Sequence, residues 1–285
     1  MIDFSTLQGL TIPEGVVTQI ADAAGNVLWS AGKPIILEVA KITSDTYAGE
    51  TTYTGESFIL LDIYPKTNGT VKVTYGGLTK TITDTSGAAE PNAQQVFFGT
   101  FNGVSDSVTT PESGELTIDG DCRGFGGGSF NLSSKNSTQW IKITEVVSFG
   151  GVQIIPDCAF SNGVSSGLLS TVIVIPNTIK SIGNRAFQNT EYLETVIIGS
   201  GVEVIGYYAF LTSAASALKT IKMQSTVPPE LVSFDDDGTS VYNNFGVPGE
   251  SGFTLTEIIV PKGCGAAYKA ATGWSTYADY IVEGS

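Results

Sequence analysis

The amino-acid sequence predicts a mainly β protein with an N-terminal hairpin, an antiparallel β-sandwich and a β-solenoid. The 285-residue chain has 34 glycines and only 15% charged residues, a composition that favours strands over long helices. Short β-branched and aromatic segments recur in its first half, and one phrase recurs in its second half. We therefore expect the hairpin in residues 1–31, the sandwich in residues 35–150 and the solenoid in residues 151–285.

The first segment, TIPEGVVTQIADAAGNVLWSAG, predicts a short hairpin around a Gly25-Asn26 turn. An isolated hairpin of this size is marginal in water. We therefore expect its apolar residues to dock on a partner protein or on the next domain. These candidate attachment residues are Val16, Val17, Ile20, Val27, Leu28 and Trp29.

The next part contains strand-like segments bounded by Gly, Asn, Ser and Pro clusters. They are IILEVAKI, SFILLDIY, TVKVTYGG, LTKTITD, QQVFFGTF, GELTIDG and QWIKITEVV. Valine and tyrosine alternate with polar residues in TVKVTYGG, which is the pattern of a half-buried strand. Seven such segments in this length predict an antiparallel β-sandwich of immunoglobulin-like size.

The last part repeats one phrase, SIGNRAF at 181–187 and VIGYYAF at 204–210. Aligning the copies pairs Ile175 with Ile198, Ile179 with Val202, Ile182 with Ile205, Gly183 with Gly206, and Phe187 with Phe210, always 23 residues apart. A repeat of this length is typical of a solenoid, in which each unit buries its apolar face against its neighbours.

Further partial copies extend the repeat to four or five rungs. IIPDCAF at 154–160 is a truncated copy, and LKTIKM and LTEIIV repeat the strand-like start of each unit. A long insertion, STVPPELVSFDDDGTSVYNNFGVPGESG, separates the last two rungs. Within each phrase we expect the phenylalanine to enter an inner column, the alanine before it to leave room for the ring, and the glycine to allow a tight left-handed turn.

At these residues the sequence resembles the BspA-type leucine-rich repeat. IVIPNTIKSIGNRAF and VIIGSGVEVIGYYAF are similar to units of the form L-x-x-V-x-I-P-x-x-V-x-x-I-G-x-x-A-F. The resemblance covers roughly residues 152–283 and implies a solenoid. It also implies that a last strand and a short helix with Tyr268, Trp274 and Tyr277 cover the open end. The long insertion departs from the repeat.

The N-terminal segment is similar to short openings of structural proteins of bacteriophages of Gram-positive gut bacteria. This resemblance is confined to TIPEGVVTQIADAAGNVLWSAG. It implies a virion protein that attaches by its N-terminus and displays the two following domains outward.

Charge and composition exclude several classes of function. The net charge of −14 repels phosphate backbones and anionic lipids, which argues against nucleic acid and membrane partners. There is no apolar run of membrane-spanning length and no pattern of a signal peptide at the start. The absence of histidine excludes Ser/His/Asp and Cys/His triads. We expect neither a cofactor nor enzymatic activity, although paired carboxylates for glycoside hydrolysis stay open.

Three cysteines and one glycine-rich segment are expected to have structural roles only. Cys122, Cys158 and Cys264 are far apart and odd in number, so they are expected to be free, small buried residues. GFGGGSF at 124–130 lacks the Lys-Ser/Thr ending of a phosphate-binding loop and is expected to be a loop between strands.

Two candidate binding sites follow from the sequence. Asp235, Asp236 and Asp237 lie together in the insertion and are candidate calcium ligands, although their spacing is not that of an EF-hand and a solvated loop is the simpler reading. Tyr207 and Tyr208 lie where the neighbouring copy has Asn184 and Arg185. At least one tyrosine is expected to face outward, either for stacking on a sugar or partner or through ordinary packing between rungs.

These observations predict a non-enzymatic bacteriophage virion protein, displayed on tail or capsid, that binds host-surface or environmental glycans or proteins. The N-terminal segment would contact other virion proteins and the repeat domain the host ligand. The alternative is a bacterial cell-surface BspA-like adhesin. The sequence leaves open whether the chain forms a homo-oligomer. It has no coiled-coil heptads, so the contacts of an oligomer would have to come from the hairpin or the sandwich.

Overall fold

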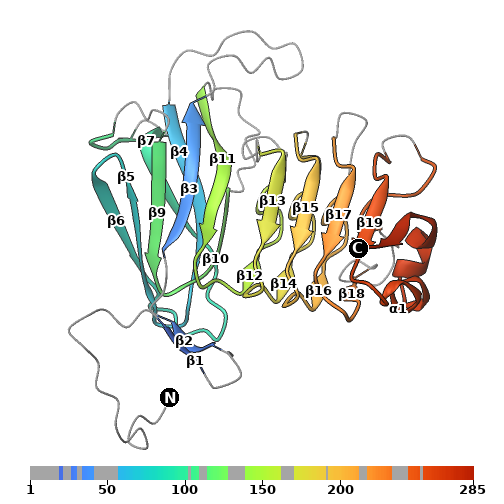
Figure 1. Ribbon diagram of the computed structural model, residues 1–285. Coiled ribbons are helices and arrows are strands. Elements are labelled where there is room, and N and C mark those ends of the chain that lie inside the picture. The colour runs from blue at the N-terminus through green and yellow to red at the C-terminus, as the bar shows by residue number, and fades with distance from the viewer. Residues whose placement is uncertain are drawn as a thin grey trace, which may run out of the picture.

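The computed structural model describes residues 19–21, 27–30, 34–41, 57–101, 104–108, 114–127, 139–161, 170–190, 192–211, 217–232, 243–250 and 253–285. In this part of the chain a layered β domain lies at one end, the repeats stack beside it, and a short helical segment covers the far end (Figure 1). No helix in the described ranges is both long enough and apolar enough to cross a membrane.

The predicted hairpin is present. Strand β1 (Gln19–Ala21) pairs antiparallel with β2 (Val27–Ser30), and Ile20 lies opposite Trp29 in the register. Val16, Val17 and the turn between the strands lie outside the described residues.

All seven predicted strands of the layered domain form. They are β3 (Ile35–Lys41), β4 (Ser57–Pro65), β5 (Thr70–Tyr75), β6 (Leu78–Thr83), β7 (Gln94–Phe101), β9 (Gly114–Gly120) and β11 (Gln139–Phe149). Two further strands, β8 (Val104–Ser105) and β10 (Cys122–Gly127), were not predicted from the sequence. The expectation of a loop at 124–130 was therefore wrong for its first four residues, which belong to β10.

The strands form two layers that share one edge. The pairing order is β6-β5-β9-β3-β11-β4-β7-β8, with β10 also on β4, and the start of β11 joins the two layers through a short parallel contact with β4. Tyr75 of β5 meets Phe98 of β7 edge-on, with ring centroids 5.9 Å apart, across the buried interior. At the two ends of this strand order, Lys80 of β6 forms an ion pair with Asp106, which follows β8, at 2.6 Å. This order does not by itself make the domain an immunoglobulin domain.

The repeats form a solenoid with two parallel sheets. One contains β12 (Ile154–Ile155), β14 (Ser181–Ile182), β16 (Val204–Ile205) and β18 (Glu230–Leu231). The other contains β13 (Val172–Ile175), β15 (Thr195–Ile198), β17 (Thr220–Met223), β19 (Glu257–Val260) and β20 (Ile281–Glu283). The sequence alignment of the copies is confirmed, because Ile175 pairs with Ile198 and Ile182 with Ile205.

The predicted aromatic column is present inside the solenoid. The rings of Phe160, Phe187 and Phe210 stack at successive centroid distances of 5.1 Å. The column then continues to Phe245, 5.9 Å from Phe210. Phe245 lies in the segment that was predicted to be an insertion between rungs. The two ends of that segment in fact complete a rung, because β18 pairs with β16 and Asn244 occupies the alanine position.

The glycine of the repeat has a different role from the one predicted. Gly183 and Gly206 are not among the residues with positive φ. Instead, a Cβ atom on Gly183 would lie 2.5 Å from the backbone nitrogen of Asp157 in the preceding rung. Glycine is required there because successive rungs approach backbone to backbone.

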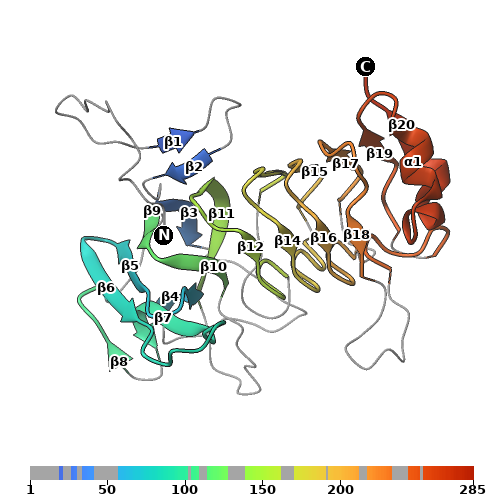
Figure 2. The ribbon, with the colours of Figure 1, turned by 90° about the horizontal axis from the view of Figure 1, so that it is seen from below.

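The layered domain and the solenoid share one continuous core. A Cβ atom on Gly124 of β10 would lie 2.9 Å from Ile154, and one on Gly126 would lie 2.8 Å from the Cα atom of Ala159. Phe125, between these glycines, contacts Phe160 of the first rung with ring centroids 5.8 Å apart. Figure 2 shows β10 beside β12, so that the first rung stacks directly on the edge of the layered domain. That edge acts as the N-terminal cap that a solenoid needs.

The far end of the stack is covered as the resemblance implied. Helix α1 (Gly265–Ala270) and the 3-10 helix η2 (Trp274–Tyr280) bury Tyr268, Trp274 and Tyr277. The polar ends of two of these rings find backbone acceptors, because Trp274 Nε1 donates to Pro229 O at 2.8 Å and Tyr268 Oη to Ser225 O at 2.9 Å. The large rings can therefore be buried without leaving a donor unpaired.

The cap should be weaker in acid because of Glu283. Its carboxylate accepts hydrogen bonds from the backbone N–H groups of Gly263 at 3.0 Å and Gly265 at 2.8 Å. These bonds favour the ionised form and lower the pKa of Glu283 from its usual 4.5. Since the pKa is lower in the folded chain than in the unfolded one, this stabilisation is complete above the unfolded pKa and is lost as the pH falls through the folded pKa.

We therefore expect Glu283→Gln to reduce the fall in melting temperature between about pH 7 and pH 3. Thermal unfolding of the two proteins over this pH range measures the difference. An identical pH dependence of the two melting temperatures would show that these hydrogen bonds do not stabilise the cap.

The cysteines are free but differ in burial. Cys122 is buried as expected, and burial raises the pKa of its thiol to about 12. Cys158 and Cys264 are only partly buried, so the expectation of burial was wrong for these two. Cys158 lies on the turn after β12 and Cys264 is the N-cap residue of α1, and neither side chain is fully covered there.

Candidate functional site

The sequence-predicted site residues divide into those inside and outside the described part of the chain. Asp235, Asp236 and Asp237 lie outside it. Among the residues that the structure describes, no three His, Cys, Asp or Glu side chains are grouped as metal ligands. Tyr207 and Tyr208 are described and lie on the turn that follows β16. The candidate site is therefore built around these tyrosines.

The turns after β12, β14 and β16 form a row along one edge of the solenoid. We call this the turn row: Asp157, Cys158, Asn184, Arg185, Tyr207 and Tyr208. The row is linked between rungs by hydrogen bonds, since Asn184 N donates to Asp157 Oδ1 at 2.7 Å and Tyr207 N donates to Asn184 Oδ1 at 3.0 Å. The side chains at equivalent positions are thus held in register along the stack.

The second residue of each turn has a left-handed backbone. The φ angles are 57° at Cys158, 56° at Arg185 and 54° at Tyr208. Non-glycine residues seldom adopt this conformation, which costs roughly 1 kcal/mol. The same angle in three successive rungs shows that it belongs to the repeat geometry and is not a special strain at the tyrosines.

Arg185 lies beside both tyrosine rings. Its guanidinium carbon is 5.3 Å from the ring centroid of Tyr207 and 6.0 Å from that of Tyr208. The two rings meet edge-on with centroids 6.1 Å apart. All three side chains are partly exposed. The prediction that at least one tyrosine faces solvent is consistent with this partial exposure. The cluster offers flat apolar faces next to a fixed positive charge.

The turn row reaches the layered domain at Tyr64 of β4. Burial raises the pKa of Tyr64, and the nearby negative charges of Asp62 and Asp157 add to the rise. The guanidinium of Arg123 lies 5.8 Å from the Tyr64 ring centroid. The partly exposed surface of tyrosine, arginine and acidic residues therefore continues from the solenoid across the junction.

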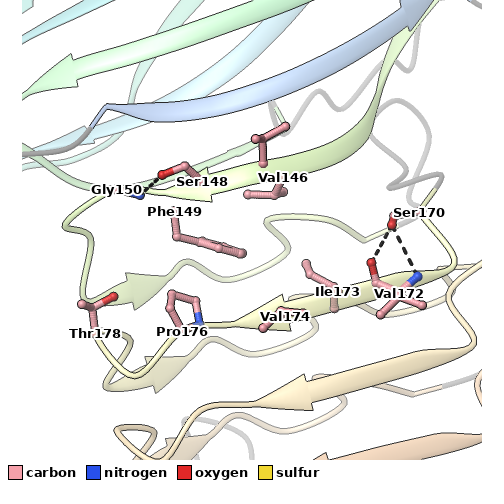
Figure 3. A pocket seen from close by; sticks show the side chains of 11 residues that line it. Val146, Ser148, Phe149, Gly150, Ser170, Val172, Ile173, Val174, Pro176 and Thr178 are labelled. Atoms are coloured by element: carbon pink, nitrogen blue, oxygen red, sulfur yellow. Dashed lines mark hydrogen bonds between the residues drawn. The ribbon is translucent and has the colours of Figure 1, made fainter.

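A hollow lies between β11 and β13 and has a volume of about 420 Å³. Figure 3 shows Phe149 between the two strands, with Val146 and Ser148 on one side and Ile173 and Val174 on the other. The hollow is lined by apolar and hydroxyl side chains without a charged group. Ligand sites usually hold a few polar groups that fix the orientation of the ligand. In this hollow the hydroxyl groups of Ser148 and Ser170 already donate to the backbone oxygens of Pro34 and Val172, so the turn row is the stronger candidate.

The sequence identified the tyrosines of this site but missed Arg185. The signal was present, because Arg185 occupies the position of Tyr208 one repeat earlier. Residues at the same place in adjacent rungs become neighbours in a solenoid. Tyr64 and the hollow carried no such signal, since each depends on how the two domains stack.

Comparison with known proteins bears on the repeats. Residues 131–228 match the BspA type leucine-rich repeat region in six copies. The match begins before the solenoid boundary expected at residue 151 and includes β11. No curated protein matches the chain, and the likeness of the N-terminal segment to phage structural proteins stays a prediction. Residues 131–228 are thus similar to the BspA type leucine-rich repeat region, and the described rungs within this range form a β-solenoid that stacks against the layered β domain.

Proposed function

We propose that this chain is a non-enzymatic, surface-displayed binding protein that recognises a glycan or protein through the turn row. The main support for this proposal is the cluster of Arg185, Tyr207 and Tyr208, which is partly exposed on the stacked rungs. Solenoids offer rigid surfaces on which function depends on the surface residues. A repeat region of the BspA type agrees with an adhesion-type protein.

The repeat itself supplies a control variant. Changing Tyr207→Asn and Tyr208→Arg converts GYYAF into GNRAF, the sequence that the preceding rung already uses. Asn184 and Arg185 adopt this turn in the native chain, so the double variant should fold with an unchanged melting temperature. It lacks both rings.

We expect the double variant to lose at least about tenfold in affinity, which corresponds to roughly 1.4 kcal/mol. Binding of labelled protein to an array of bacterial surface glycans and to whole bacterial cells measures this. Tyr192→Asn, which removes an exposed tyrosine of the same solenoid, is the control and should leave binding unchanged. Equal binding by wild type and Y207N/Y208R would exclude the turn row as the site.

The location of the protein separates two forms of this proposal. In the first, the N-terminal hairpin attaches the chain to a bacteriophage tail or capsid, by the residues Ile20, Val27, Leu28 and Trp29 and the preceding Val16 and Val17. In the second, the chain is a bacterial cell-surface adhesin, and the family match of residues 131–228 favours this form. Either form is compatible with a homo-oligomer.

Mass spectrometry of purified virions and of bacterial envelope fractions distinguishes the two forms. Presence in virions, with release on deletion of residues 1–31, would support attachment by the hairpin. Presence only in envelopes would leave the adhesin.

A further inference from the structure

We infer that Arg185 anchors the carboxylate of an acidic sugar, while Tyr207 or Tyr208 contacts the apolar face of the sugar ring. This inference rests on the proposed function, because it names the ligand class of the same turn row. It is carried by the surroundings of the guanidinium group and by the polar groups one rung away.

The chain contains only two arginines, Arg123 and Arg185, and both lie over tyrosine rings. Arg123 has acceptors within the protein: one guanidinium nitrogen donates to Pro91 O at 3.1 Å, and another lies 3.6 Å from a carboxylate oxygen of Glu90. Arg123 is therefore a structural arginine. Acceptors of the protein therefore hold two of its three guanidinium nitrogens, while its buried Nε has no hydrogen-bond partner in the described part of the chain.

Arg185 differs from Arg123 in this respect. Within the described part of the chain, its guanidinium has ring contacts with Tyr207 and Tyr208 but no hydrogen-bond acceptor or ion-pair partner. Its donors form a rigid planar fork that matches a carboxylate with two parallel hydrogen bonds. The rings beside it limit its rotation, so less conformational freedom is lost when such a ligand binds.

The neighbouring positions of the turn row favour a sugar over a peptide. Asp157 is exposed and precedes Arg185 by one rung, and Asn184 lies beside it. Their side-chain oxygens already accept hydrogen bonds within the row, those of Asp157 from Asn184 and that of Asn184 from the backbone N–H of Tyr207. Each oxygen has a second lone pair, to which a sugar hydroxyl can donate. Adjacent rungs are separated by about 5 Å, as the 5.1 Å between stacked phenylalanine rings shows. One sugar ring can therefore reach the arginine and the polar groups together.

A single carboxylate also suits the local charge better than a phosphate. Arg185 is the one cation of the turn row as defined above, and Asp157 supplies a negative charge nearby. A phosphate group can carry close to two negative charges. It would meet the same carboxylate with only one cation to offset it, in a protein of net charge −14. An uronate or sialate residue carries one charge and several hydroxyl groups.

The test titrates the full chain with a panel of uronate and sialate oligosaccharides, each paired with its methyl-esterified form. Esterification removes the charge and keeps the sugar. We expect at least one acidic member to bind about tenfold or more tightly than its ester. Arg185→Asn should abolish this preference, and asparagine accepts the left-handed backbone of this turn. Arg185→Lys, which keeps the charge but loses the planar fork, should retain only part of it.

Two further proteins complete the test. Lys180→Gln removes an exposed positive charge from the same solenoid and should leave the preference unchanged, which separates a local contact from an effect of net charge. Poly-glutamate serves as the acidic peptide probe and should bind no more tightly than the esters.

The inference is overturned if no acidic member binds more tightly than its ester, if Arg185→Asn keeps the preference, or if poly-glutamate binds as tightly as the acidic sugars. A neutral glycan that Y207N/Y208R loses and Arg185→Asn retains would also overturn it. In that last case the turn row would remain the binding site, so the proposed function would stand without this inference.

Discussion

Replacing Phe187 by serine is expected to unfold the solenoid. The Phe187 side chain is only 1% exposed and stacks between Phe160 and Phe210, each with ring centroids 5.1 Å away. Removing a buried phenylalanine ring costs about 3–5 kcal/mol, and burying a hydroxyl without a partner adds to this. The total is a large part of the roughly 5–15 kcal/mol that stabilises a typical domain.

Chemical denaturation followed by circular dichroism measures this loss. Val174→Ser is the matched control, because Val174 is 55% exposed on the outer face of β13, in the same repeat unit as Phe187. It should change the free energy of unfolding by no more than about 0.5 kcal/mol. A Phe187→Ser protein as stable as the control would mean that the aromatic column does not hold the rungs together.

Replacing Gly126 by valine is expected to separate the solenoid from the layered domain. Already the Cβ atom would lie 2.8 Å from the Cα atom and 3.1 Å from the carbonyl oxygen of Ala159. These are backbone atoms of the first rung, which cannot rotate away as a side chain could. Overpacking of this kind costs about 1–3 kcal/mol or more. The first rung would also lose the surface that covers its open face.

Calorimetry tests whether the two parts unfold together. The shared core predicts one cooperative transition in the native chain and two transitions, or an early loss of the solenoid, in Gly126→Val. Gly151→Ala lies just before the first rung, where an added Cβ atom meets nothing within 4 Å, and should behave as wild type. Two separate transitions already in the native chain would contradict the coupling.

Local patterns were sufficient to predict the repeats and most strands. Residues such as Ile175, Ile182 and Phe187 recur at a fixed step, and in a solenoid each contacts its own copy in the next rung. The packing partner of each residue is therefore written in the same short phrase. The role of the repeat glycine was predicted wrongly. A left-handed turn and a close approach between two backbones both favour glycine, and the φ angle in the structure distinguishes the two cases.

The insertion between the last rungs shows where such patterns fail. Asn244 and Phe245 lack the Ile-Gly phrase before them, so the sequence alone did not show that they complete a rung. Asn244 is held there by hydrogen bonds from its amide nitrogen to the carbonyl oxygens of Ile205, Gly206 and Val232. These partners come from two rungs and become neighbours only in the folded stack.

The sequence by itself determined the mainly β composition and the solenoid register, because each follows from residues close together or one repeat apart. Only the tertiary structure decided that β10 caps the first rung and that Arg185 has ring contacts but lacks acceptors such as those of two Arg123 nitrogens. The capping contact joins segments about thirty residues apart through two glycines, whose missing side chains carry no apolar pattern. Whether an arginine is satisfied depends on which acceptors the fold brings within hydrogen-bond distance.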